Sequence, residues 1–69
     1  MQQEIRLLNV VALTEDLPEK GLLRGQVGTV VEVLGPDAFD VEFVDEAGQT
    51  YAQAALRTDQ LLLLHFQPA

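Results

Sequence analysis

The sequence predicts an all-β protein, and three observations support this fold class. Its apolar residues fall in short runs rich in valine, turn-forming residues recur about every ten residues, and no stretch has the spacing of a long amphipathic helix. A chain of 69 residues has room for one domain. We therefore expect a single domain over residues 1–69, with a core that spans residues 8–66.

The first strand is predicted over Asn9–Leu13, and the polar segment Thr14–Arg24 that follows is expected to form a long loop. The second strand is predicted over Val27–Leu34, where apolar residues on both faces are typical of a strand shared between two packed layers. We expect Gly25 and Gly28 to permit a bend at its start. A phosphate-binding loop is disfavoured, because it needs a lysine, a hydroxyl residue and a following helix.

The third strand is predicted over Phe39–Val44, where apolar and acidic residues alternate so that one face is buried. A tight turn at Asp45–Gly48 leads into a fourth strand that ends at Leu56. The segment Arg57–Gln60 is expected to form one 3₁₀ turn before a last strand at Leu61–Leu64. Five short strands, a long first loop and one short turn before the last strand describe an SH3-like barrel.

The register follows from the requirement that facing residues share one side of a sheet. Across the Asp45–Gly48 turn, we expect Phe43, Val41 and Phe39 to face Thr50, Ala52 and Ala54 inside, and Glu42 and Asp40 to face Tyr51 and Gln53 outside. Between the second and third strands, Val33 and Val31 are expected to face Phe39 and Val41, which places Glu32 opposite Asp40. The predicted inner lining is Val31, Val33, Phe39, Val41, Phe43 and Leu56.

A family resemblance is carried by three stretches, which read NVVALTEDLPEKGLLRGQVGTVVEVL, VEFVDEAGQTYA and LRTDQLLLL. They resemble a family of small bacterial proteins that is defined only as a domain of unknown function, over residues 8–66. Asn9 departs from the aspartate that the family usually has. Some members look like one half of a two-gene pair, which implies a protein partner. The stretch RGQVGTVVEV also resembles the KOW-type opening of ribosomal and transcription-factor barrels.

Composition limits the class of protein. The chain has no cysteine, which excludes disulfides and thiolate metal sites and favours a reducing cytoplasm. Its longest aliphatic run, Leu61–Leu64, is far shorter than the ~20 residues that cross a bilayer, and the first residues lack the order of a signal peptide. Eleven acidic against four basic residues give a net charge of −7, which disfavours binding to nucleic acid.

The sequence contains few residues that could catalyse a reaction. Serine and cysteine are absent, and His65 is the only imidazole, so we expect neither a nucleophile with its base nor a transition-metal site. The stretch DAFDVEFVDE lacks the glycine and the terminal glutamate of an EF-hand loop. Paired carboxylates need a cleft that separates their pKa values, which so small a barrel does not offer. We predict a protein that is not an enzyme and holds no cofactor and no metal.

The outer side of the third strand is the first candidate binding surface. We expect Glu32, Asp40 and Glu42 to cluster there and name these three carboxylates the acidic face; Tyr51 and Gln53 should lie beside it. Like charges that face one another cost stability, so a functional role is one explanation of the cluster. The alternative is a charged strand surface that only keeps the protein soluble.

The first loop and the chain ends supply two further candidate surfaces. In the loop, Leu17 and Pro18 either tuck under the barrel, which we favour, or offer an apolar anchor to a partner; the candidate loop residues are Thr14, Glu15, Asp16, Leu17 and Pro18. The first and last strands are apolar on both sides, so one side must point away from a thin core. We predict a homo-oligomer contact there, with Leu7, Leu62, Leu64 and Phe66 as its residues.

Three functions are compatible with this pattern. The first is a non-catalytic protein-binding module that docks a basic or mixed segment on the acidic face, with Tyr51 as anchor and the Thr14–Lys20 loop at the rim. The second is a KOW-like barrel associated with the ribosome or RNA. The third is a small enzyme or an enzyme regulator.

Overall fold

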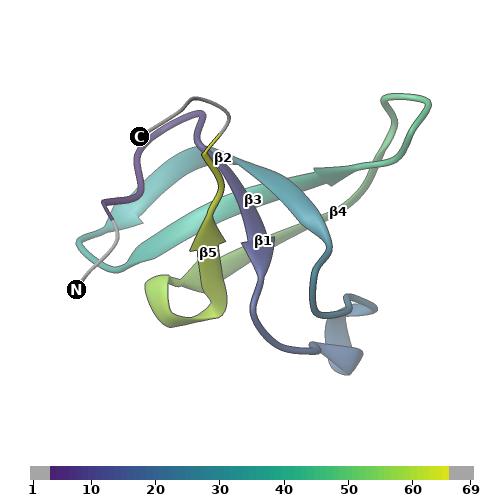
Figure 1. Cartoon of the computed structure of the whole chain (residues 1–69), viewed down its shortest axis with the longest axis horizontal. Helices are drawn as coiled ribbons and strands as arrows, with labels where there is room; N and C mark the ends of the chain where they lie inside the picture. Colours follow the sequence, from purple (N-terminus) through teal and green to yellow (C-terminus); the bar gives the residue numbers. More distant parts are fainter. Residues whose placement is uncertain (1–3, 66–69) are drawn as a thin grey trace.

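The structure, a computed structural model, describes residues 4–65 and contains five antiparallel strands in one sheet (Figure 1). Its only helical segments within that range are two 3₁₀ helices, η1 in the first loop and η2 before the last strand. The all-β class, the five strands, the long first loop and the short last turn are confirmed. The elements are β1 (Val10–Leu13), η1 (Pro18–Lys20), β2 (Val27–Gly35), β3 (Ala38–Val44), β4 (Thr50–Arg57), η2 (Thr58–Gln60) and β5 (Leu61–Leu63).

The strands lie in the order β4-β3-β2-β1-β5, so β4 and β5 form the two edges of the sheet. The predicted closure into a barrel is wrong, because no strand pairing joins β4 to β5 or β1. The sheet instead curves strongly, and β1 and β5 cross in front of β3 and β4 in Figure 1. The long strand β2 connects these two layers, and the core lies between them.

A β-bulge in β2 changes the predicted inner lining. Val30, not Val31, faces Val41, because the bulge between Val30 and Glu32 leaves Val31 as an extra residue. Val30 is fully buried, whereas Val31 is half-buried and Val33 is 49% exposed. The prediction that Val31 and Val33 line the core is therefore wrong. The bulge makes Val31 the extra residue, and Val33, although it keeps its predicted place opposite Phe39, is exposed. Beyond the bulge, Glu32 faces Asp40 and Val33 faces Phe39, as predicted.

The β3–β4 hairpin is longer than predicted, which moves the register by two residues. The Asp45 carboxylate accepts hydrogen bonds from the backbone N–H groups of Ala47 (2.9 Å) and Gln49 (3.0 Å), and this stabilises a wider tip. A bulge in β4 adds Tyr51 as an unpaired residue. The predicted facing pairs are therefore wrong: Phe43, Val41 and Phe39 face Ala52, Ala54 and Leu56, and Glu42 and Asp40 face Gln53 and Ala55.

Gly28 lies where β2 passes closest to β3. A Cβ atom on Gly28 would lie 2.7 Å from Cγ1 of Val41 and 2.9 Å from both Cδ2 of Phe43 and the backbone oxygen of Glu42. Gly25, with φ of +90°, forms the left-handed turn before β2. The two glycines thus have different roles: Gly25 turns the chain into β2, and Gly28 permits the close packing of β2 on β3.

Replacing Gly28 with alanine should destabilise the protein. The added methyl group meets backbone as well as two fully buried side chains, so we expect Gly28→Ala to lower the free energy of unfolding by about 1–3 kcal/mol. Urea denaturation measures this change. Gly35→Ala is the matched control, because a Cβ atom there meets nothing within 4 Å. Equal effects of the two substitutions would contradict the close packing.

Candidate functional site

The acidic face is a consequence of the alternation in β3. Phe39, Val41 and Phe43 are buried, so the intervening carboxylates of Asp40 and Glu42 lie on the opposite side of the strand. Glu32 in β2 lies directly opposite Asp40. The structure therefore brings together the three predicted carboxylates on the outer side of β2 and β3.

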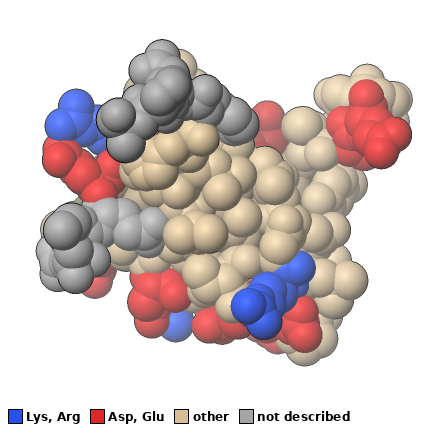
Figure 2. Space-filling model, viewed as in Figure 1, with Lys and Arg blue, Asp and Glu red and all other residues tan. Residues whose placement is uncertain are grey.

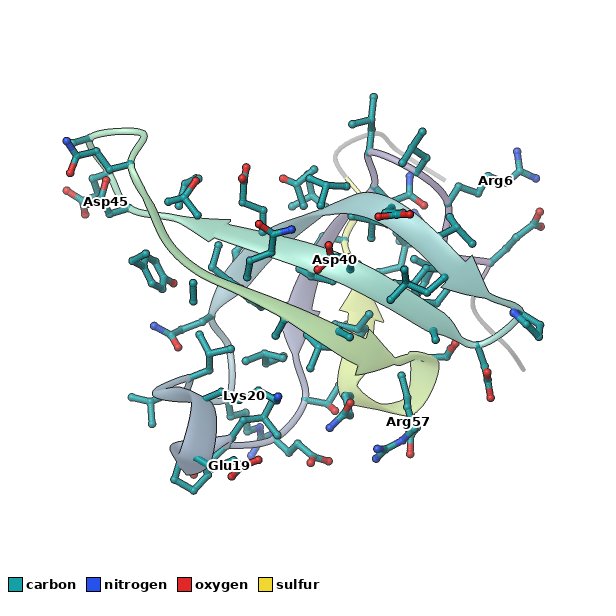
Figure 3. All side chains as sticks on the ribbon, turned by 180° about the vertical axis from the view of Figure 1, so that it is seen from behind. Arg6, Glu19, Lys20, Asp40, Asp45 and Arg57 are labelled. Carbon is teal, nitrogen blue, oxygen red and sulfur yellow. The ribbon has the colours of Figure 1, made fainter. Side chains whose placement is uncertain are left out.

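No basic side chain of the described residues neutralises this cluster. The two ion pairs within residues 4–65 are Arg6 with Glu4 and Arg57 with Asp59, and both are exposed. In Figure 3, Asp40 lies near the middle of the face, whereas the labelled basic side chains Arg6, Lys20 and Arg57 lie at its periphery. The acidic face consequently presents its negative charge to any approaching group.

Gln53 is the neutral member of the site. Its Nε2 atom donates a hydrogen bond of 2.7 Å to Oδ2 of Asp40, across from β4 to β3. Because Gln53 faces Glu42, its side chain reaches Asp40 diagonally. Gln53 thus orients one carboxylate of the acidic face without removing its charge.

Tyr51 lies outside the carboxylate row. The prediction that it faces Glu42 is wrong, because Tyr51 is the extra residue of the β4 bulge. Its ring centroid is 6.3 Å from that of Phe43, a core residue, while the side chain is 46% exposed. Tyr51 therefore lies at the hairpin end of the site, not at its centre.

The first loop is held against the sheet by its own residues. Leu17 is only 5% exposed, as the tucking alternative predicts, and its backbone exchanges two hydrogen bonds with Leu22 (2.8 and 3.1 Å). The Asp16 carboxylate accepts a hydrogen bond from the Arg24 N–H (2.8 Å), and the Thr14 hydroxyl donates one to the Asp59 carbonyl (3.1 Å). Glu15 and Pro18 are exposed and are the parts of the candidate loop open to a partner.

On the side of the sheet opposite Val11, Leu62 of β5 and Val27 of β2 are exposed, whereas Ala12 of β1 between them is only 8% exposed. Ala12 faces Leu62 on one side and Val27 on the other, and these three residues form what we call the apolar strip. Leu62 is 52% exposed. Figure 2, viewed with β5 in front, shows no charged side chain of the described residues at the centre of this face.

The predicted oligomer residues do not all lie in this strip. Leu64 is half-buried beside it and donates a backbone hydrogen bond to Val10 (3.0 Å). Leu7 is exposed but precedes β1, and Phe66 lies outside the described residues. Val27 was not among the predicted residues, although its place at the start of an apolar strand was a signal for it.

Residues 4–65 contain no group of three or more His, Asp or Glu side chains placed to hold a metal ion. None of the helical segments in that range is long and apolar enough to cross a membrane. His65, the only histidine, is exposed after β5.

Asn9 retains the contact that an aspartate at this position would make. Its Oδ1 atom accepts a hydrogen bond of 2.7 Å from the backbone N–H of Arg6, which stabilises the turn before β1. Either an amide or a carboxylate oxygen can accept this bond. The aspartate that the resemblance implies at this position would accept the same bond, so asparagine leaves the turn intact.

Comparison with known proteins places the chain in a family of unknown activity. Residues 7–63 match the family described as "Domain of unknown function (DUF4926)". Neither the curated proteins nor the solved structures contain a match. The likeness to SH3-like and KOW-type barrels stays a prediction, whereas the resemblance to an uncharacterised family is confirmed. Because the match covers most of the sequence, this chain belongs to the DUF4926 family.

Proposed function

We propose that this chain is a non-catalytic protein-binding module that docks a basic segment of a partner protein on its acidic face. The observation that carries the proposal is the cross-strand placement of Glu32 and Asp40, beside Glu42, with no described cation paired to any of the three. A cationic segment would relieve the repulsion among these carboxylates. A partner encoded beside this chain is compatible with the two-gene pairs of similar proteins.

Electrostatic complementarity of this kind acts mainly on association rate and specificity. The net charge of −7 adds a long-range attraction for a basic partner and repels nucleic acid. Tyr51, Glu15 and Pro18 are exposed and lie outside the carboxylate row, and we assign them to the rim of the contact. Added salt should therefore slow association more than it speeds dissociation.

Charge reversal tests the proposed surface. We expect the triple variant Glu32→Lys, Asp40→Lys and Glu42→Lys to lose a specific partner that the natural chain retains in a pull-down from native lysate. The matched control reverses Glu4, Asp37 and Glu46, which are exposed and lie in neither the acidic face nor the first loop. Both variants change the net charge equally. Circular dichroism checks that each one folds.

The control separates the acidic face from net charge alone. Loss of the partner from both triple variants would show that total charge, not this surface, attracts it. Retention by the acidic-face variant would contradict the proposed function. A mobility shift of bulk RNA at low salt would instead favour the RNA-associated alternative.

We also propose that the apolar strip is covered by a second copy of this chain. Its exposed leucine and valine carry no charge, so two strips can approach without the repulsion that the acidic faces would cause. Light scattering after size exclusion should give a mass above 7.6 kDa at micromolar concentration. Leu62→Glu should return the protein to a monomer. A 7.6 kDa species of the unaltered chain would contradict this contact.

A further inference from the structure

The outer edge of β4 is a row of backbone groups that no strand of the described chain covers. β4 is the last strand on its side of the sheet and pairs only with β3. In Figure 3, β4 runs across the front of the molecule. Such an edge is a template for pairing with another chain.

Two hydrogen bonds show which backbone groups of β4 point outward. Thr58 donates its N–H to the carbonyl of Asp37, which it faces (3.1 Å), so Asp37 and Thr58 form a hydrogen-bonded pair. The next facing pair, Ala38 and Arg57, is therefore a non-hydrogen-bonded pair. In agreement, the Arg57 N–H turns to Oε1 of Gln60 (2.9 Å). Hydrogen-bonded and non-hydrogen-bonded pairs alternate along the ladder. The N–H and C=O groups of Ala55 and Gln53 therefore point away from β3, toward the free edge.

This stretch of edge lacks the usual protection against pairing. Natural edges are blunted by charged side chains, proline or bulges. Ala52–Leu56 contains neither charge nor proline, and the bulge at Tyr51 and the charge of Arg57 lie outside it. The open edge is thus regular along its middle.

The acidic face indicates what chemistry the edge would accept. Glu32, Asp40 and Ala55 form one row across β2, β3 and β4, so the row ends at the free edge with a methyl group. A residue added opposite Ala55 would project on the same side, about 10 Å from β3, since neighbouring strands lie ~4.8 Å apart. A lysine or arginine there could extend over Ala55 to the Asp40 carboxylate. A second copy of β4 would bring two acidic faces together.

We propose that the partner's basic segment binds as an additional β-strand on the free edge of β4. This inference rests on the proposed function and specifies how the acidic face is used. The backbone of Ala55 and Gln53 would hold the segment by hydrogen bonds, and a lysine or arginine opposite Ala55 would reach Asp40. The mode is strand addition, in which main-chain bonds supply affinity and alternate side chains supply specificity.

Amide hydrogen exchange measured by NMR tests this mode directly. The probe is a synthetic peptide of alternating lysine and valine, acetyl-(Lys-Val)₃-Lys-amide. At a peptide concentration ten times its Kd, we expect exchange of the Gln53 and Ala55 amides to slow about tenfold. The Ala52 and Ala54 amides are internal controls, because they already point toward β3 and should change little.

Substitutions in β4 and methylation of the peptide test the same backbone hydrogen bonds. Ala55→Pro removes an outward N–H without breaking the β3 ladder, and should weaken peptide binding about tenfold or more. Ala55→Ser keeps the N–H and a small side chain and should bind as the natural chain does. If Ala55→Pro fails to fold, peptides methylated on the lysine or on the valine amides replace it. Each blocks one edge of the peptide, and at least one should lose binding.

The outcomes separate this inference from the proposed function. In one outcome, Asp40→Asn and added salt weaken peptide binding, but the peptide does not change amide exchange at Gln53 and Ala55. That result would support the acidic face as the binding surface and overturn the added strand. No binding at low salt would overturn both. In another outcome, these amides are protected without peptide, and their protection increases with protein concentration. That result would show a second copy of the chain on the edge and would overturn a basic partner there.

Discussion

The burial of Phe39, Val41 and Phe43 on one face of β3 is the constraint on which the rest of the structure depends. These side chains pack on β2 through Val30 and the bare backbone at Gly28, and on β4 through Ala52, Ala54 and Leu56. Because a strand alternates its side chains, the same burial places Asp40 and Glu42 outside. The position of the acidic face is therefore fixed by the core. Moving these carboxylates to the other side of β3 would require a change in the packing of the core.

This arrangement places the two proposed binding surfaces on one side of the molecule. The carboxylates of β2 and β3 form the acidic face, and one strand further β4 ends the sheet with open backbone groups. Gln53 belongs to both features, since its side chain contacts Asp40 and its backbone points to the free edge. The apolar strip lies on β5, β1 and β2, which leaves β4 accessible if the strip is covered. The proposed basic partner and the proposed second copy would therefore bind without competing.

The sequence predicts the strands well because their signals are local. Three features follow from the sequence alone, namely the alternation over Phe39–Val44, the 3₁₀ turn before Leu61, and the glutamate–aspartate pair across β2 and β3. The two bulges do not follow, because the alternation around Val31 and Tyr51 reads equally well without them. Asp45 and Gly48 did indicate the wider tip of the β3–β4 hairpin. The side chain of Asp45 can accept backbone hydrogen bonds, and Gly48 readily adopts a positive φ. The free edge of β4 was missed because a closed barrel was expected.

The proposed function depends on a cost in stability that the unneutralised carboxylates of the acidic face impose on the fold. A double-mutant cycle with Glu32→Gln and Asp40→Asn measures that cost directly, by urea denaturation at low salt. We expect a repulsive coupling of about 0.2–1 kcal/mol. It should shrink in 1 M salt, where the screening length falls to about 3 Å. A coupling of zero, or an attractive one, at low salt would contradict repulsion within the acidic face.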